Sequence, residues 1–88
     1  MISKTLSYAE HKEQQKRLKR AEKAVKESEA KIEKMEQRLK ELDGLLMVPE
    51  NASDMELVTE YTTIKRSLDE EVERWEKLSE ELEGISNN

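Results

Sequence analysis

Residues 18–46 of this chain read LKRAEKAVKESEAKIEKMEQRLKELDGLL, and an apolar or small side chain recurs there at alternating steps of three and four. The recurring positions are Leu18, Ala21, Val25, Ser28, Ile32, Met35, Leu39, Leu42 and Leu46. This spacing is the heptad repeat of a coiled-coil seam, and each recurring position is called a rung of the seam. Most positions between the rungs are charged or carry an amide. One thin helix cannot bury such a stripe alone, so the stretch predicts a partner helix.

A second seam in the same chain supplies that partner. Its steps are again of three and four, and its positions are Leu57, Tyr61, Ile64, Leu68, Glu71, Trp75, Leu78, Leu82 and Ile85. Only a short connection around Pro49 separates the two seams, and so short a link forces the helices to be antiparallel. The predicted fold class is therefore all-α, a two-helix antiparallel coiled-coil hairpin.

Capping signals and helix breakers set the expected boundaries. Ser7–Glu10 and Ser53–Glu56 each fit a capping box, in which the Ser hydroxyl accepts the Glu N–H and the Glu side chain reaches back to the Ser amide. Asp54 adds negative charge at the second helix N-terminus, Pro49 ends the first helix, and Gly84 ends the second. We expect a linker remnant at 1–6, a hairpin at 7–85 with helices at about 8–47 and 54–83 around a turn at 48–53, and a disordered tail at 86–88.

Side-chain volumes predict a register for the pairing. Trp75, the largest side chain of the second seam, is best accommodated opposite Ser28, one of the smallest rungs of the first. The same register sets Glu71 against Ile32, and it leaves residues 7–17 protruding as a single helix unless they fold back or meet another partner. It also predicts two flanking ion pairs, Glu36–Lys65 and Arg38–Glu60.

Composition favours long solvated helices over a thick globular core. Of the 88 residues, 42% are charged and only 3% are aromatic, a balance typical of long helices. Disorder is the alternative for so charged a chain, but an unbroken heptad seam argues against it. With no cysteine, disulfides and thiolate metal sites are excluded. No apolar run approaches the roughly 20 residues that cross a bilayer, and residues 1–6 lack the apolar core of a signal peptide, so we expect a cytoplasmic protein without a membrane partner.

Catalytic chemistry has no candidate residues in this sequence. His11 is the one histidine, and no second His or Cys is present to share a metal with it. Carboxylates are abundant, but a two-helix hairpin offers no pocket that would shift their pKa values. No Gly-rich phosphate loop and no nucleophile elbow occur. We therefore expect no enzyme activity, no cofactor and no metal in these residues.

The charge distribution predicts a binding surface. Cations outnumber acids from Glu10 to Lys26, whereas eight acids accompany two cations from Asp69 to Glu83. One interpretation is mutual compensation, because the hairpin lays the two stretches side by side; a net charge of −5 also argues against a strongly cationic module. The alternative is that the basic end, whose lysines recur at helical spacing, contacts nucleic-acid phosphates. The candidate nucleic-acid-binding residues are Lys12, Lys16, Arg17, Lys19, Arg20, Lys23 and Lys26.

Three pieces of this sequence resemble one protein family in their order along the chain. They are Leu6-Ser7-Tyr8 followed by Glu10, Lys12, Glu13 and Gln14; then Pro49-Glu50; then Glu73-Arg74-Trp75-Glu76-Lys77-Leu78. Together they resemble the C-terminal domain of ABC-F ATPases of the Uup type, whose closing ERWEEL stretch the last piece is similar to. The resemblance implies an accessory coiled-coil hairpin that follows two ATP-binding cassettes in a parent chain and contacts DNA or ribosomal RNA. ATP hydrolysis would belong to those cassettes.

We therefore expect a non-catalytic C-terminal accessory domain of a soluble ABC-F ATPase. Its expected partners are nucleic acid, either DNA or ribosomal RNA, and the ATP-binding cassettes of the parent chain. A monomer is favoured over a homodimer. The rival hypothesis is a structural or protein-interaction arm, a spacer or a dimerisation element, with no nucleic-acid role.

Overall fold

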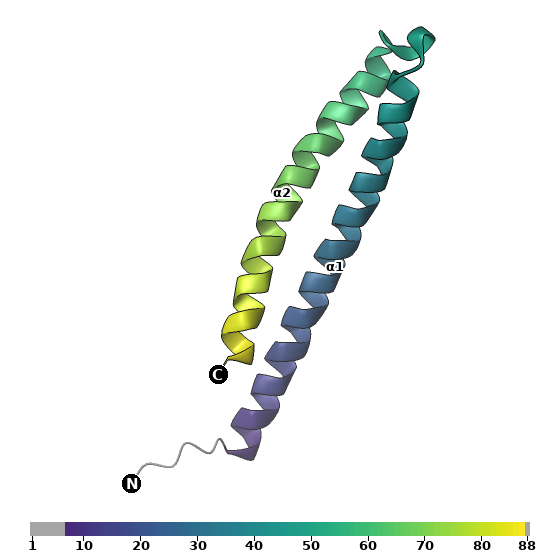
Figure 1. Cartoon of the computed structure of the whole chain (residues 1–88). Helices are drawn as coiled ribbons and strands as arrows, with labels where there is room; N and C mark the ends of the chain where they lie inside the picture. The colour runs from purple at the N-terminus through teal and green to yellow at the C-terminus, as the bar shows by residue number, and fades with distance from the viewer. Residues whose placement is uncertain (1–6, 88) are drawn as a thin grey trace.

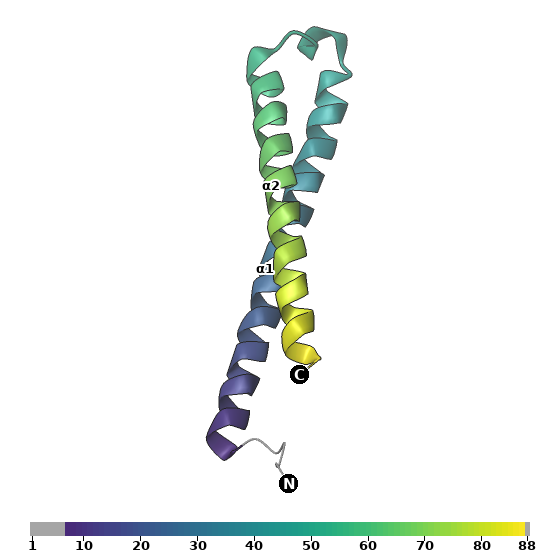
Figure 2. The ribbon, with the colours of Figure 1, turned by 90° about the vertical axis from the view of Figure 1, so that its left-hand side faces the viewer.

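The computed structural model describes residues 7–87, which form two long helices joined by a short turn. The elements are α1 (Tyr8–Leu46), the 3-10 helix η1 (Pro49–Asn51) and α2 (Met55–Ser86). The two long helices lie antiparallel and side by side (Figure 1), and they cross one another when the molecule is turned (Figure 2). The hairpin measures 75 × 16 × 14 Å. The predicted all-α, two-helix hairpin is confirmed; the expected linker at 1–6 and Asn88 lie outside the described residues.

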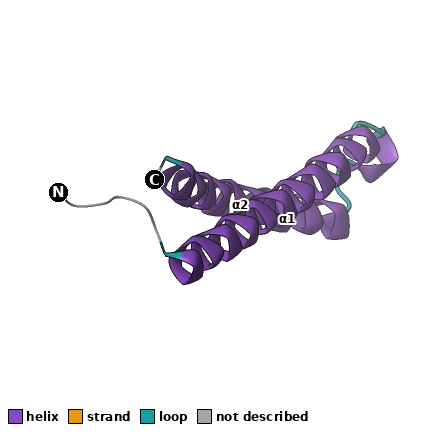
Figure 3. Ribbon diagram, turned by 90° about the horizontal axis from the view of Figure 1, so that it is seen from below, coloured by secondary structure: helices purple, strands orange, loops and turns teal. Residues whose placement is uncertain are grey.

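Both predicted seams lie between the helices. Val25, Ser28, Leu39 and Leu42 of α1 and Leu68 of α2 are buried, and the remaining rungs of both seams are half-buried. Leu42 is wholly inaccessible to solvent. Figure 3, seen from below, shows that each helix has only the other as a neighbour. Each helix can therefore bury only the side that faces the other, which is why few positions are enclosed.

α1 begins at the predicted capping box. Ser7 is the N-cap, and its hydroxyl oxygen accepts the backbone N–H of Glu10 at 3.2 Å. The Glu10 carboxylate accepts from the Ser7 hydroxyl at 2.9 Å, where a capping box would have the Ser7 amide as donor. The first turn of the helix is therefore closed by a side-chain pair as well as by the cap itself.

α2 is capped by a different residue from the one its capping box predicts. Asp54, and not Ser53, is the N-cap: its Oδ1 accepts the backbone N–H groups of Glu56 at 3.0 Å and of Leu57 at 3.3 Å. A carboxylate is the stronger acceptor, and its negative charge also interacts favourably with the positive end of the helix dipole. The predicted cap at Ser53 is wrong for this physical reason.

Glycine ends neither helix. α1 continues through Gly44 to Leu46, close to the predicted end at 47. α2 continues through Gly84 to Ser86, three residues past the predicted end at 83, and Asn87 is its C-cap, so Ser86 belongs to the helix and not to a disordered tail. A glycine in a helix costs about 1 kcal/mol relative to alanine, and the neighbouring seam contacts outweigh that cost.

The connection between the helices is held by its own hydrogen bonds. The backbone N–H of Val48 donates to the carbonyl oxygen of Leu45, and that of Asn51 donates to Val48. The Asn51 side chain adds a bond from Nδ2 to the Leu45 carbonyl at 3.1 Å, which satisfies an end of α1 that has no further helical partner. Pro49 lies in the first turn of η1, where its missing N–H costs nothing.

Cross-helix hydrogen bonds identify the partners of two polar groups at the seam. The Ser28 hydroxyl donates to Glu71 Oε2 at 2.6 Å, and the Trp75 indole N–H donates to Glu29 at 3.2 Å. The Glu71 carboxylate therefore reaches one helical turn past Ile32, the residue that the predicted register sets against it, and Trp75 reaches Glu29, the neighbour of Ser28. A carboxylate in the seam needs a donor, and Ser28 is the one rung of the first seam that has one. The hydrogen bond from Ser28 thus satisfies the one acidic position of the second seam.

The predicted flanking pair of Arg38 and Glu60 is confirmed. Arg38 Nε and Nη2 donate to the two Glu60 carboxylate oxygens at 2.7 and 2.8 Å, a bidentate geometry, and Arg38 Nη1 also contacts Glu41 at 3.1 Å. These bonds hold the pKa of Glu60 below its usual range and raise that of Arg38. The predicted pair of Glu36 and Lys65 is not among the ion pairs that residues 7–87 form.

Candidate nucleic-acid interface

All seven predicted nucleic-acid-binding cations lie on α1 and are exposed. If Leu18 is assigned to heptad position a, five of them occupy the outward b and f positions without interruption. These five, the outer lysine row, are Lys12, Lys16, Lys19, Lys23 and Lys26. The other two, Arg17 and Arg20, occupy positions g and c and belong to a different side of the helix.

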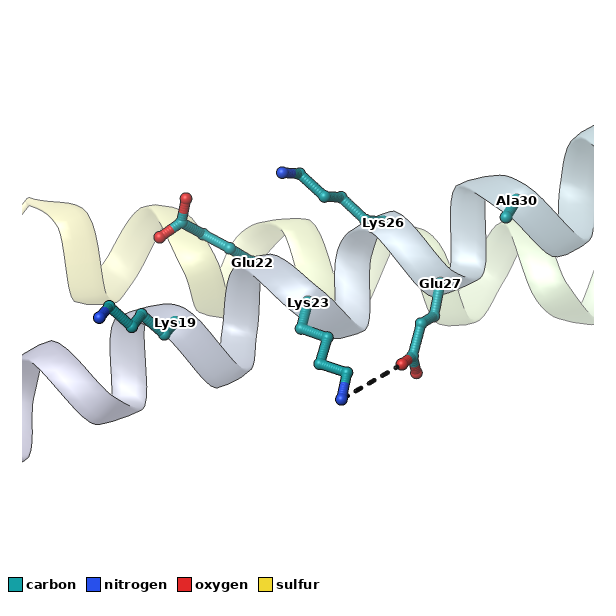
Figure 4. A pocket seen from close by; sticks show the side chains of 6 residues that line it. All are labelled: Lys19, Glu22, Lys23, Lys26, Glu27 and Ala30. Atoms are coloured by element: carbon teal, nitrogen blue, oxygen red, sulfur yellow. Dashed lines mark ion pairs between the residues drawn. The ribbon is translucent and has the colours of Figure 1, made fainter.

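Part of the outer lysine row is seen in Figure 4, on the side of α1 turned away from α2. Three of its lysines lie around a shallow depression there, and the Lys23 ammonium lies 3.9 Å from the Glu27 carboxylate. Both side chains of that pair are well exposed, so the pair is weak and does not withdraw Lys23 from other anions. The depression is lined by Lys19, Glu22, Lys23, Lys26, Glu27 and Ala30.

The two arginines lie beside the second helix. Arg17 and Arg20 line a groove between the helices whose other residues include Glu81 and Ile85 of α2. Arg17 therefore lies beside the last turn of α2, so the protrusion predicted for residues 7–17 does not include it. Figure 1 shows that the start of α1 extends past the end of α2. The seven predicted cations thus form two surfaces. The interpretation that the acids of α2 compensate the cations of α1 applies to the two arginines, which lie near Glu81.

The outward positions of α2 carry the opposite charge. With Leu68 at position a, every b and f position from 69 to 83 holds an acid, and all five are exposed. They form the outer acidic row: Asp69, Glu73, Glu76, Glu80 and Glu83. The two rows face away from one another across a rod 16 × 14 Å in section. Since the Debye length at physiological salt is about 8 Å, the acidic row is largely screened at the lysine surface.

This arrangement was not predicted from totals of charge. A net charge of −5 describes the sum of two faces, and a ligand meets one face at a time. The b and f positions of α1 carry the lysines, and those of α2 carry the acids, so the two charges lie on separate faces. The geometry offers a line of ammonium groups for phosphates on one side of the rod.

Other kinds of site find no support in the part of the chain that the structure describes. Among residues 7–87, no three His, Asp or Glu side chains are grouped so that they could hold a metal ion. In the same residues, neither helix has a stretch both long and apolar enough to pass through a bilayer.

Comparison of the chain with protein-family models, with curated proteins and with solved structures returns no match. The resemblance to ABC-F C-terminal domains therefore stays a prediction. What bears on function in this molecule is the charge and exposure of its two outer rows and of its ends.

Proposed function

We propose that the hairpin is a non-catalytic accessory arm that binds the phosphate backbone of nucleic acid through the outer lysine row. The observation that carries this proposal is the unbroken run of five exposed lysines at b and f positions between Lys12 and Lys26. Figure 4 shows three of them, Lys19, Lys23 and Lys26, on the face turned away from α2. At a rise of 1.5 Å per residue the row is about 20 Å long, which is enough to follow several phosphates. Ammonium groups bind phosphates as point charges and do not read bases.

The position of the row in the fold supports the same function. Ile85, in the last turn of α2, lies beside Arg17, so the first lysines of the row stand on the part of α1 that the second helix leaves uncovered. A duplex can approach there without meeting the outer acidic row. The seam between the two helices keeps α1 straight, so the spacing between its lysines is fixed.

The resemblance to ABC-F ATPases supplies a context for this arm. In such a protein the hairpin would follow two ATP-binding cassettes in a cytoplasmic parent chain, and its ligand would be DNA or ribosomal RNA. Phosphate contacts suit both ligands because they carry no sequence information. ATP hydrolysis would be the work of the cassettes, and the hairpin would contribute a contact to their substrate.

Titration of labelled duplex DNA and of a structured RNA tests the proposal. We expect binding at low salt and a steep loss of affinity as salt is raised, with about 0.9 counterion released per phosphate contacted on duplex DNA. The variant K16E/K19E/K23E should lose most of this affinity while keeping its helical circular-dichroism spectrum. Absence of binding to both ligands at low salt would contradict the proposal and favour a protein-interaction arm.

A further inference from the structure

The tip of the hairpin exposes apolar side chains that the rest of the rod does not. Five of the six large apolar side chains that are exposed among residues 7–87 lie within 14 positions of one another around the turn. We call them the tip patch: Leu45, Met47, Val48, Met55 and Val58. Met47 is 84% exposed and Met55 is 70% exposed, so the patch is open to solvent and lies outside the seam.

The turn does not need these side chains in order to hold its shape. Asn51 ties the turn to α1 through its side chain, its backbone N–H donates to Val48 within the turn, and Asp54 caps α2. The apolar groups therefore stand on a backbone that is already ordered. A pre-ordered apolar surface loses little conformational entropy when a partner covers it, which is the property that favours binding.

The tip also has a charge of one sign. Between Lys40 and Lys65 there is no Lys, Arg or His. The same interval contains six acids: Glu41, Asp43, Glu50, Asp54, Glu56 and Glu60. Two of them bind Arg38 and one caps α2. The other three, Asp43, Glu50 and Glu56, lie beside the tip patch and surround it with negative charge.

We propose that the tip patch docks onto a protein surface that is both apolar and basic, such as the apolar face of an amphipathic helix flanked by Lys and Arg. Methionine side chains adapt to varied apolar surfaces, and the surrounding acids favour cations at the rim. The same acids repel nucleic acid, an anionic membrane and the tip of a second copy. The tip lies at the opposite end of the rod from the start of α1 (Figure 1), so this inference does not rest on the lysine row.

Titration of the isotope-labelled chain with a designed peptide tests the docking surface. The probe is a helical peptide of about 18 residues with leucines on one face and lysines on the other. We expect saturable shifts of the backbone amides between Leu45 and Val58. The stretch from Asp69 to Glu83 is an internal control, because it has eight acids but its large apolar side chains are half-buried. Shifts confined to that stretch, or no shifts at all, would overturn the proposal.

Variants separate the apolar contribution from the charge. M47S/M55S removes apolar surface without changing charge and should weaken peptide binding about ten-fold or more, while Y8S, which changes an exposed apolar side chain at the other end, should leave it unchanged. A peptide with the same leucine face and glutamates in place of lysines should not bind. Equal binding of the lysine and glutamate peptides would overturn the assignment of a basic partner. So would a tip that inserts into phosphatidylcholine vesicles but binds neither peptide.

Discussion

The hydroxyl of Ser28 donates to the carboxylate of Glu71 at 2.6 Å inside the seam, and so joins the polar rung of α1 to the acidic rung of α2. Ser28 is 2% exposed and the Glu71 side chain 13%. A slip of one rung in either direction would place the carboxylate against an apolar side chain and leave it only Arg74 of its own helix, whose Nε lies 3.9 Å away. The pair therefore selects one register among those that the heptad spacing allows.

Removing the donor should destabilise the hairpin. Ser28→Ala leaves the Glu71 carboxylate without its seam partner, which we expect to cost about 1–3 kcal/mol in the free energy of unfolding measured in urea. Adding Glu71→Leu to the same chain removes the stranded charge and should restore the loss. Ser79→Ala, at a half-buried serine of α2 outside the seam, is the control and should change little. If Ser28→Ala unfolded like the parent, the pair would have no role in holding the register.

Leu42 should be the most sensitive apolar position of the seam. It is wholly buried, so Leu42→Ala is expected to cost about 2–5 kcal/mol. Trp75 is half-buried and its indole N–H reaches the exposed Glu29, so Trp75→Ala should cost less than Leu42→Ala. The volume-based register predicts that Trp75→Ala is among the most damaging single changes, at about 3 kcal/mol or more. Urea unfolding of the two variants under the same conditions gives their order, and a larger loss for Trp75→Ala than for Leu42→Ala would contradict the expectation from burial.

The cap of α2 can be tested with two alanine variants. Asp54→Ala removes the acceptor of two backbone N–H groups and should lower stability by about 1 kcal/mol. Ser53→Ala should lie within about 0.5 kcal/mol of the parent, because no cap bond depends on it. Thermal unfolding of both variants is sufficient. A larger loss for Ser53→Ala would return the N-cap to the position that the capping box predicts.

The ion pair of Arg38 and Glu60 should make stability depend on pH. Because Arg38 holds the pKa of Glu60 below its usual range, the ionised carboxylate is favoured in the folded chain. Its contribution is fully present above the unfolded pKa of about 4.3 and is lost as pH falls through the lower, folded pKa. Glu60→Gln should therefore melt below the parent at neutral pH, and the two melting temperatures should converge in acid. Glu80→Gln, on the outer acidic row, is the control and should show no such convergence. A difference in melting temperature between Glu60→Gln and the parent that stayed constant with pH would contradict a stabilising role for the ionised Glu60.

The hairpin is predictable from sequence because its signals are local. The heptads of 18–46 and 57–85 define two seams, and Pro49 leaves a link too short for anything but an antiparallel return. Register is a property of pairs across the seam, and the bond of Ser28 to Glu71 is one pair that side-chain volume alone does not predict.

The candidate surfaces are predictable only in part. The spacing of Lys12 to Lys23 predicts one stripe, and the lysines that form it are all exposed on α1. Arg17 and Arg20 fall outside that stripe, because each follows a lysine of the row directly and consecutive helical residues point about 100° apart. The sequence prediction groups them with the lysines by their charge and not by the direction of their side chains. The outer acidic row has a sequence signal of its own, an acid at every b and f position of 69–83. The tip patch has none, because a turn has no periodicity from which exposure can be inferred.

The outer lysine row is tested most directly by the salt dependence of DNA affinity in two variants of equal charge. In the first, the five lysines of the row become glutamine. In the second, five exposed lysines elsewhere become glutamine: Lys31, Lys34, Lys40, Lys65 and Lys77. If each lysine of the row contacts a phosphate, the slope of log affinity against log salt should become shallower by about 4.5 in the first variant and stay close to the parent's in the second. Equal slopes in the two variants would contradict the proposal, because binding would then follow net charge and not the lysine row.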